Sequence, residues 1–98
     1  MASDRAARAR IRVEPAGAAF RVAVDDGVSR TSHVVTVSPD EQARYGPGID
    51  PVRLVEESFR FLLEREPAAS ILPRFSLGVI ERYFPEYPEE IRRRLRVG

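Results

Sequence analysis

The side chains that most often carry out acid–base or metal chemistry are sparse in this 98-residue sequence. His33 is the one histidine, and there is no cysteine. A lone histidine with no acid beside it in the sequence lacks the partners that make imidazole a metal ligand or a catalytic base. We therefore expect His33 to pack next to Phe20, at the rim of a buried sheet face, without a catalytic or metal-binding role.

Carboxylates are more numerous, and two of them can act as general acid and base where a pocket shifts their pKa values. Glu56, Glu57, Glu64 and Glu66 fall within one predicted helix, in which arginines stand one helical turn away. That spacing predicts ion pairs on a solvated helix face rather than a catalytic pair. The expected pairs are Arg53 with Glu57, Glu56 with Arg60, and Arg60 with Glu64.

Signatures of nucleophilic catalysis and of phosphate binding are missing. No serine lies in a Gly-x-Ser-x-Gly motif, and the glycines stand at turns rather than in a phosphate-cradling loop. We predict no catalytic residue, no cofactor, no metal ion and no small-molecule substrate, so the chain is not expected to be an enzyme. An enzyme with an unrecognised site is the remote alternative.

The best candidates for a binding surface are aromatic and basic residues near the C-terminus. Tyrosine and arginine are enriched at the centres of protein interfaces. The alternative is structural: Phe84 and one tyrosine fill the core, Pro85 and Pro88 fix a turn, and the last arginines form a solvated helix end. The candidate partner-binding residues are Arg82, Tyr83, Tyr87, Arg92 and Arg93.

Charge and composition limit the partners further. The formal charge is +1, and residues 38–91 hold six arginines against eleven acids, whereas residues 92–98 hold four arginines and no acid. This distribution differs from the one-faced basic surface of a nucleic-acid binder, so nucleic acid is the less supported partner. No apolar run approaches the ~20 residues that cross a bilayer. Without cysteine or a signal-peptide pattern, we expect a cytoplasmic protein with no membrane contact.

These residues need a scaffold, and residues 10–38 predict three antiparallel strands joined by turns at Pro15–Ala18 and at Asp26–Gly27. With these turns, Val13 lies opposite Phe20 and Val22 opposite Thr31. Both turns then place the same residues on one apolar face. That face holds Ile11, Val13, Phe20, Val22, Val24, Thr31, His33, Val35 and Val37.

Helices are predicted for the rest of the chain. Residues 38–41 (Ser-Pro-Asp-Glu) form a capping box that opens a short helix, and residues 46–48 (Gly-Pro-Gly) end it. Residues 51–66 have the longest helical periodicity, with Asp50 at the N-cap and Pro67 beyond the end. Two further helices begin near Ser76 and Pro88.

We therefore predict an α+β fold: a three-stranded antiparallel β-meander followed by a short helix, a central long helix (about 51–66) and two C-terminal helices. The meander packs its apolar face on the central helix, and the C-terminal helices cover the other flank. Residues 1–9 are expected to form a disordered N-terminal arm, and residues 10–98 a single domain.

Two resemblances bear on function. Residues 58–67 (SFRFLLEREP), 70–72 (SIL) and 80–87 (IERYFPEY) resemble a group of small uncharacterised bacterial and archaeal proteins, in which a β-hairpin precedes this helical signature. That resemblance covers about residues 20–91 and implies no activity, cofactor or catalytic residue.

The second resemblance lies in residues 34–66, whose order of strand, short helix, loop and longer helix is similar to that of ribbon-helix-helix repressors and antitoxins. In that family a strand from each subunit pairs with its mate and enters the DNA major groove. The resemblance implies Ser32, Val34 and Thr36 as DNA-reading residues. The sequence departs from it in that the strand already has a hairpin partner.

The expected function is a small non-catalytic interaction or regulatory module that self-associates or docks on a larger protein. Two observations favour it: the missing catalytic constellations, and a short sheet with two free edges to which another chain can add a strand. A ribbon-helix-helix-like DNA-binding regulator is the alternative.

Overall fold

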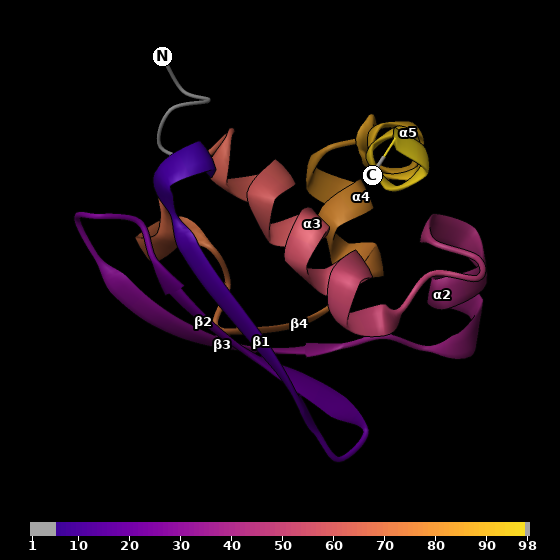
Figure 1. The fold of residues 1–98 in the computed structure, drawn as a ribbon, viewed down its shortest axis with the longest axis horizontal. Coiled ribbons are helices and arrows are strands. Elements are labelled where there is room, and N and C mark those ends of the chain that lie inside the picture. Colours follow the sequence, from indigo (N-terminus) through magenta and orange to yellow (C-terminus); the bar gives the residue numbers. More distant parts are fainter. Residues whose placement is uncertain (1–5, 98) are drawn as a thin grey trace.

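A four-stranded sheet lies against one side of α3, and the C-terminal helices lie against its other side (Figure 1). The computed structural model describes residues 6–97. The elements are β1 (Arg10–Ala16), β2 (Ala19–Asp25), β3 (Arg30–Thr36), α2 (Pro39–Tyr45), α3 (Pro51–Leu63), the 3-10 helix η1 (Ala68–Ser70), β4 (Arg74–Ser76), α4 (Gly78–Tyr83) and α5 (Tyr87–Val97). The α+β class is as predicted.

The first three strands form the predicted antiparallel meander, but a fourth strand extends it. β4 runs parallel to β3, and backbone bonds from Val34 N to Pro73 O (2.8 Å) and from Leu77 N to Thr36 O (3.0 Å) fix its two ends. The prediction of a purely antiparallel three-stranded sheet is therefore wrong in this respect. β4 is three residues long, which is too short for a period-two pattern, so pairing with β3 and not local sequence defines it.

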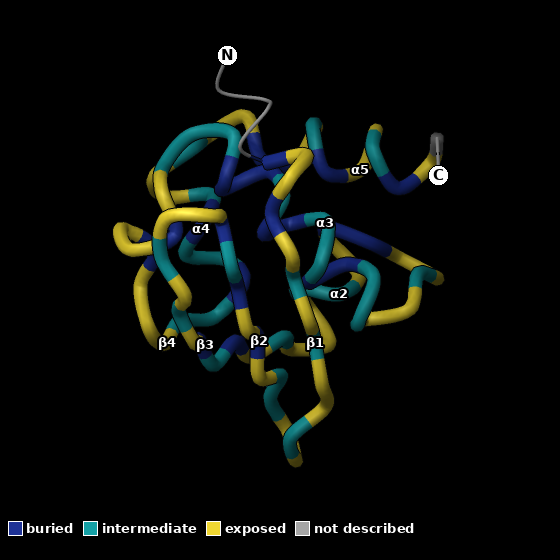
Figure 2. The backbone as a smooth tube through the Cα atoms, turned by 60° about the vertical axis from the view of Figure 1, so that its left-hand side comes forward, coloured by how far each residue is buried: buried dark blue, intermediate teal, exposed yellow. Residues whose placement is uncertain are grey.

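Both hairpins pair two residues away from the predicted register. Val13 lies opposite Val22 instead of Phe20, and Val22 lies opposite His33 instead of Thr31. Because side chains alternate with a period of two, a shift of two residues leaves each one on its predicted face. The inward face is accordingly the predicted one, as the alternation of buried and exposed positions along the strands shows (Figure 2). Its buried members are Val22, Val24, His33 and Val35.

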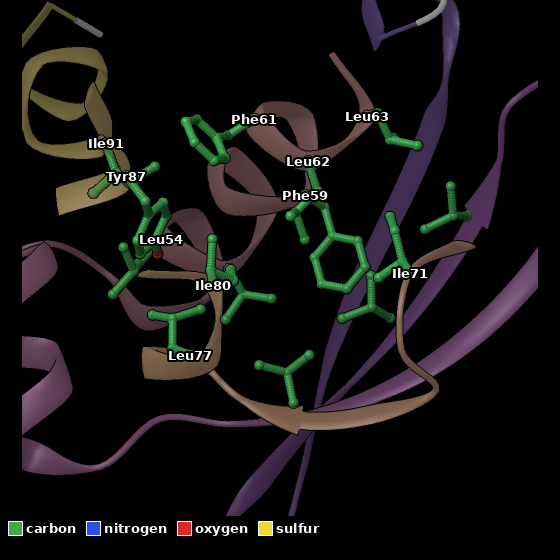
Figure 3. Close-up of a cluster of buried hydrophobic side chains, with 14 of the residues drawn as sticks. Leu54, Phe59, Phe61, Leu62, Leu63, Ile71, Leu77, Ile80, Tyr87 and Ile91 are labelled. Carbon is green, nitrogen blue, oxygen red and sulfur yellow. The ribbon is translucent and has the colours of Figure 1, made fainter. Parts of the chain in front are cut away.

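α3 is the predicted central helix, although it ends at Leu63 rather than at residue 66. Asp50 Oδ1 accepts a hydrogen bond from Val52 N at 3.0 Å, and Pro51 occupies the first turn, where a missing N–H is tolerated. Figure 3 shows side chains of the helix meeting those of the C-terminal segments. The buried residues of α3 are Leu54, Val55, Ser58, Phe59, Phe61, Leu62 and Leu63.

The charged face of α3 is less solvated than predicted. The Glu56–Arg60 pair is present at 3.5 Å. Glu64, however, pairs with Arg94 of α5 and with Arg65, and Arg53 donates to the backbone oxygen of Leu95 at 3.4 Å. α5 thus covers part of a face whose ion pairs were predicted to lie within one helix.

α2 opens with the predicted capping box. Ser38 Oγ accepts from Glu41 N at 3.1 Å, and Glu41 Oε1 accepts from Ser38 N at 2.9 Å. The second carboxylate oxygen of Glu41 accepts from Gly78 N at 2.8 Å. One side chain therefore closes the start of α2 and holds the start of α4 against it.

The prediction of a disordered arm over residues 1–9 falls partly on residues that the structure describes. Of this stretch, residues 1–5 lie outside the described residues. Residues 6–8 form a helical turn in which Ala6 is buried, as is Ala9 after it. Arg60 donates to the backbone oxygen of Ala6 at 3.2 Å, so α3 holds this turn in place.

Candidate binding pocket

An apolar pocket of about 340 Å³ opens between the end of α3, the segment from η1 to β4, and α4. Ligand-binding clefts range from roughly 300 to 1,000 Å³, so this pocket is at the small end, with room for an apolar side chain or a small molecule. Two other hollows, of about 240 and 230 Å³, are lined in part by arginines. The apolar walls of the first pocket include Leu62, Ile71, Leu72, Phe75, Val79 and Ile80.

Two polar side chains, one in β3 and one in the loop before it, hold the segment of residues 68–72 that includes the pocket wall at residues 70–72. Asp26, in the loop between β2 and β3, accepts from Ala68 N with Oδ2 at 3.0 Å. This bond satisfies a backbone N–H at the start of η1 that has no partner within the helix. His33 Nδ1 lies 2.8 Å from the backbone oxygen of Leu72. Because a carbonyl oxygen only accepts, Nδ1 carries the proton, and the wall is tied to the sheet at both of its ends.

His33 packs in the interior of the fold, but its surroundings differ from the predicted ones. In the neutral ring with its proton on Nδ1, Nε2 accepts the hydroxyl proton of Thr31, whose Oγ1 lies 2.8 Å away. The ring is buried and packs against Phe59 of α3, with centroids 5.2 Å apart, instead of beside Phe20 at a rim. Both ring nitrogens are used within the fold.

The opposite wall is α4, and polar contacts on its outer side position it. Arg44 donates to both carboxylate oxygens of Glu81, at 3.0 and 2.7 Å, and the hydroxyl of Tyr45 donates to Glu81 at 2.7 Å. These donors lower the pKa of the Glu81 carboxyl to about 2, the Arg44 hydrogen bond being the largest cause. A Cβ on Gly78 would lie 2.9 Å from Glu41 Oε2, so a larger residue there would force the Glu41 carboxylate to shift.

Glu66 supplies the one ionisable carboxylate of the lining. It lies in the turn after α3, and burial in the apolar pocket raises the pKa of its carboxyl. No cation or hydrogen-bond donor among the described residues contacts this carboxylate. A half-buried carboxylate in an apolar cleft favours a ligand that brings a positive charge or an N–H donor.

The rim of the pocket exposes apolar surface. Within residues 6–96, three large hydrophobic side chains are exposed: Val28 (90%), Tyr83 (67%) and Leu72 (43%). Two of the three, Leu72 and Tyr83, line this pocket. A contiguous apolar surface with a polar group inside it is typical of sites where another molecule binds.

The structure distributes the predicted partner-binding residues over different environments. Tyr83 lines the pocket, and Arg82 beside it is exposed. Tyr87 is fully buried and fills the core, which is the place that the structural alternative gives to one tyrosine, so it is left out of the proposed binding surface. Arg92 donates to the backbone oxygen of Arg44 at 2.9 Å, and Arg93 pairs with Glu90.

The residues implied by the ribbon-helix-helix resemblance lie on the outer face of β3. Ser32 and Thr36 are exposed and Val34 is half-buried. β3 is flanked by β2 on one side and by β4 on the other. At Val34–Thr36 both edges of β3 are occupied, so this part of the strand is not free to pair with a second subunit as strands do in that family.

Sequence reasoning missed Glu66 and most of the apolar lining. The helical spacing places Glu66 on the solvated face of a helix, but α3 ends at Leu63. Beyond the end of a helix its periodicity no longer says which way a side chain points. The available signal was Pro67, which stops the helix and makes the orientation of the residues just before it depend on the turn.

Comparisons with protein-family models, with curated proteins and with solved structures find no match to this chain. The site must therefore be interpreted from its own geometry. Among the described residues there is no group of three or more histidine, aspartate or glutamate side chains that could hold a metal ion. None of the helices in the described part of the chain is long and apolar enough to span a bilayer.

Proposed function

We propose that the protein is a small non-catalytic interaction module that binds an apolar side chain of a partner protein in the pocket between α3, η1–β4 and α4. The observation that carries the proposal is the placement of Leu72 and Tyr83. These exposed apolar side chains stand at the mouth of a hollow whose walls are also apolar. Covering them with a partner would remove apolar surface from water at about 25 cal/mol per Å².

Glu66 gives the proposed partner a chemical character. An apolar anchor alone would leave this carboxylate further desolvated and unpaired, which is unfavourable. An anchor next to a lysine, an arginine or another N–H donor would instead compensate the carboxylate while filling the pocket. The proposed partner segment is therefore apolar with an adjacent positive charge.

The make-up of the lining supports binding over catalysis. Its polar side chains include Glu66, Ser70 and Tyr83, while His33 lies elsewhere with both ring nitrogens engaged. Activating a serine nucleophile needs a base within hydrogen-bond reach; no histidine lines the pocket, and Ser70 makes no hydrogen bond to the Glu66 carboxylate. A cytoplasmic location also remains a proposal, supported by the absence of cysteine.

The test is selection of peptides from a random twelve-residue display library on the immobilised chain, followed by calorimetric titration of the enriched peptides. We expect enrichment of sequences with a large apolar residue next to arginine or lysine. Leu72→Ser and Tyr83→Ser should each weaken a selected peptide about tenfold or more, as residues at the centre of an interface do.

Val28→Ser is the matched control, because it removes a still more exposed apolar side chain that does not line the pocket. It should leave the affinity unchanged. Enriched peptides that bind the Leu72 and Tyr83 variants as tightly as the wild-type chain would refute the proposal. If no peptide is enriched and a small apolar amine binds in the pocket, the proposal of a protein partner is wrong. The ligand would then be a small molecule.

A further inference from the structure

β1 is an edge strand whose outer side is unpaired within the described residues (Figure 2). It is seven residues long and hydrogen-bonds to β2 alone in the sheet. Natural sheets protect such edges or use them to pair with another chain. The outward backbone groups and the charged side chains of β1 indicate which strand can pair with it.

The geometry of the first hairpin tells which backbone groups face outward. Ala16 and Ala19 close a two-residue loop, and Gly17 in that loop has a φ of 67°, as such loops require. The pair that closes a two-residue loop exchanges both backbone hydrogen bonds, and hydrogen-bonded pairs recur at every second residue. Even-numbered residues of β1 therefore bond to β2, and odd-numbered residues direct their N–H and C=O groups to the free edge.

The odd-numbered residues of β1 are Ile11, Val13 and Pro15. The side chains of Ile11 and Val13 lie on the inner face and are only half-buried, because no further strand lies beside them. Pro15 has no N–H, and its position on the unpaired side is where prolines occur in strands. The edge thus offers two complete pairs of backbone groups with partly exposed apolar side chains above them.

The charges on the outer face select a partner and a register. Arg12 and Glu14 flank Val13 and are both exposed, with Arg12 Nε 3.2 Å from Glu14 Oε1. If two copies of β1 pair antiparallel about Val13, Arg12 of each copy lies opposite Glu14 of the other. A pairing centred on Arg12 would place two arginines opposite each other, and one centred on Glu14 would place two glutamates together. Like charges directly opposite in a sheet are unfavourable.

We propose that two copies of this chain associate through β1, antiparallel about a two-fold axis at Val13, to form a continuous eight-stranded sheet. In this arrangement Val13 of one copy meets Val13 of the other, and Ile11 lies opposite Pro15. The surface is distinct from the pocket, which β4 and α4 border at the other end of the sheet. The experiments on self-association and on peptide binding can therefore refute one proposal without refuting the other.

Disulfide trapping tests the axis directly, because the native chain has no cysteine. In the proposed dimer the two copies of residue 13 are a directly opposed pair, about 5.5 Å apart at Cα, which a disulfide can bridge. Val13→Cys should form a cross-linked dimer under mild oxidation. Ile11→Cys, the matched control, places its thiols several residues apart along the strands and should cross-link at least tenfold more slowly.

Charge exchange tests the register in solution. Sedimentation velocity of the wild-type chain at low salt should show an average mass that rises with concentration above 11.1 kDa. Arg12→Glu and Glu14→Arg should each weaken self-association about tenfold or more, since each places like charges opposite one another. A mixture of the two variants should restore it as a mixed dimer, since opposite charges then meet at both positions.

Arg96→Glu and Glu89→Arg on α5 carry the same charge changes away from β1 and should not alter self-association. A wild-type chain that stays monomeric at millimolar concentration would overturn the proposal. So would equal cross-linking of the Val13→Cys and Ile11→Cys variants, or a mixture of the two charge variants that associates no better than either alone.

Discussion

The hydroxyl of Tyr87 donates a hydrogen bond to Ser58 Oγ at 2.7 Å, in a site where both side chains are fully buried. The direction follows from the third member of the group. Ser58 Oγ also lies 2.7 Å from the backbone oxygen of Leu54, which can only accept, so the serine proton points there. The tyrosine must then supply the proton of the second bond. Burial raises the pKa of the Tyr87 hydroxyl, which keeps it protonated and able to donate.

This arrangement predicts that Ser58→Ala is more damaging than Tyr87→Phe. The serine variant leaves a buried tyrosine hydroxyl without an acceptor, at about 1–3 kcal/mol of unfolding free energy, whereas the phenylalanine variant loses a satisfied bond worth about 0.5–1.5 kcal/mol. Urea unfolding of both variants measures the difference. The double variant should be less destabilised than the sum of the single ones; strict additivity would contradict the shared bond.

Glu81 predicts a pH dependence. The donors Arg44 and Tyr45 lower the pKa of its folded-state carboxyl to about 2, below the ordinary value of 4.5. The stabilisation is therefore present above pH 4.5 and is lost as the pH falls through about 2. Melting temperatures across this range should fall less steeply for Glu81→Gln than for the wild-type chain. A residual slope is expected from Glu90, whose pKa the Arg94 hydrogen bond lowers. Identical slopes would show that Glu81 does not act in this way.

Glu66 predicts the opposite dependence. Burial raises the pKa of its carboxyl in the folded chain, so the ionised form opposes folding once the pH rises through that value. Glu66→Gln should stabilise the chain at pH 7 and much less at pH 3, while it weakens binding of a basic apolar peptide. Binding pockets often carry such a conflict between stability and function. A variant that is less stable at pH 7 than the wild-type chain would contradict this prediction.

Asp26 connects the sheet to the pocket wall. In Asp26→Asn an amide group replaces either the oxygen that accepts from Ala68 N or the one that accepts from Ser29 N. At least one buried or partly buried N–H donor then loses its acceptor, at about 1–3 kcal/mol. Amide hydrogen exchange should become faster at residues 68–72. Asp25→Asn is the control. The Asp25 carboxylate is more exposed than that of Asp26, so its replacement should change the free energy of unfolding by roughly 0.5 kcal/mol or less. Unchanged exchange in the Asp26 variant would exclude this role.

The secondary structure was predictable where local chemistry decides it. The capping box at Ser38, the N-cap at Asp50 and the alternation of Val22 and Val24 are properties of neighbouring residues, and each of these elements is present. The hairpin registers were less predictable. In the second turn Asp26 Oδ1 accepts from Val28 N and Ser29 N, and these bonds lengthen the loop that Asp26–Gly27 alone predicts. The first loop is instead shorter than predicted, because Ala16 pairs with Ala19 and leaves only residues 17–18 in the turn.

The pocket could not be predicted, because residues distant in sequence create it. Its wall at residues 70–72 is held by Asp26 and His33 of the sheet, and its other wall at α4 is held by Glu41 of α2. Neither set of contacts leaves a local pattern. Tyr83 was among the predicted binding residues because of its type, but only the fold distinguishes it from the buried Tyr87 four residues later.

The most direct test of the central claim, that this pocket binds an apolar side chain of a partner, is methyl chemical-shift mapping. An enriched peptide would be titrated into the methyl-labelled chain. The account predicts that the signals of Leu62, Ile71, Leu72 and Val79 shift in proportion to occupancy, while that of Val28 does not move. Shifts confined to the outer face of the sheet, at Val34 for instance, with unchanged signals in the pocket, would contradict it.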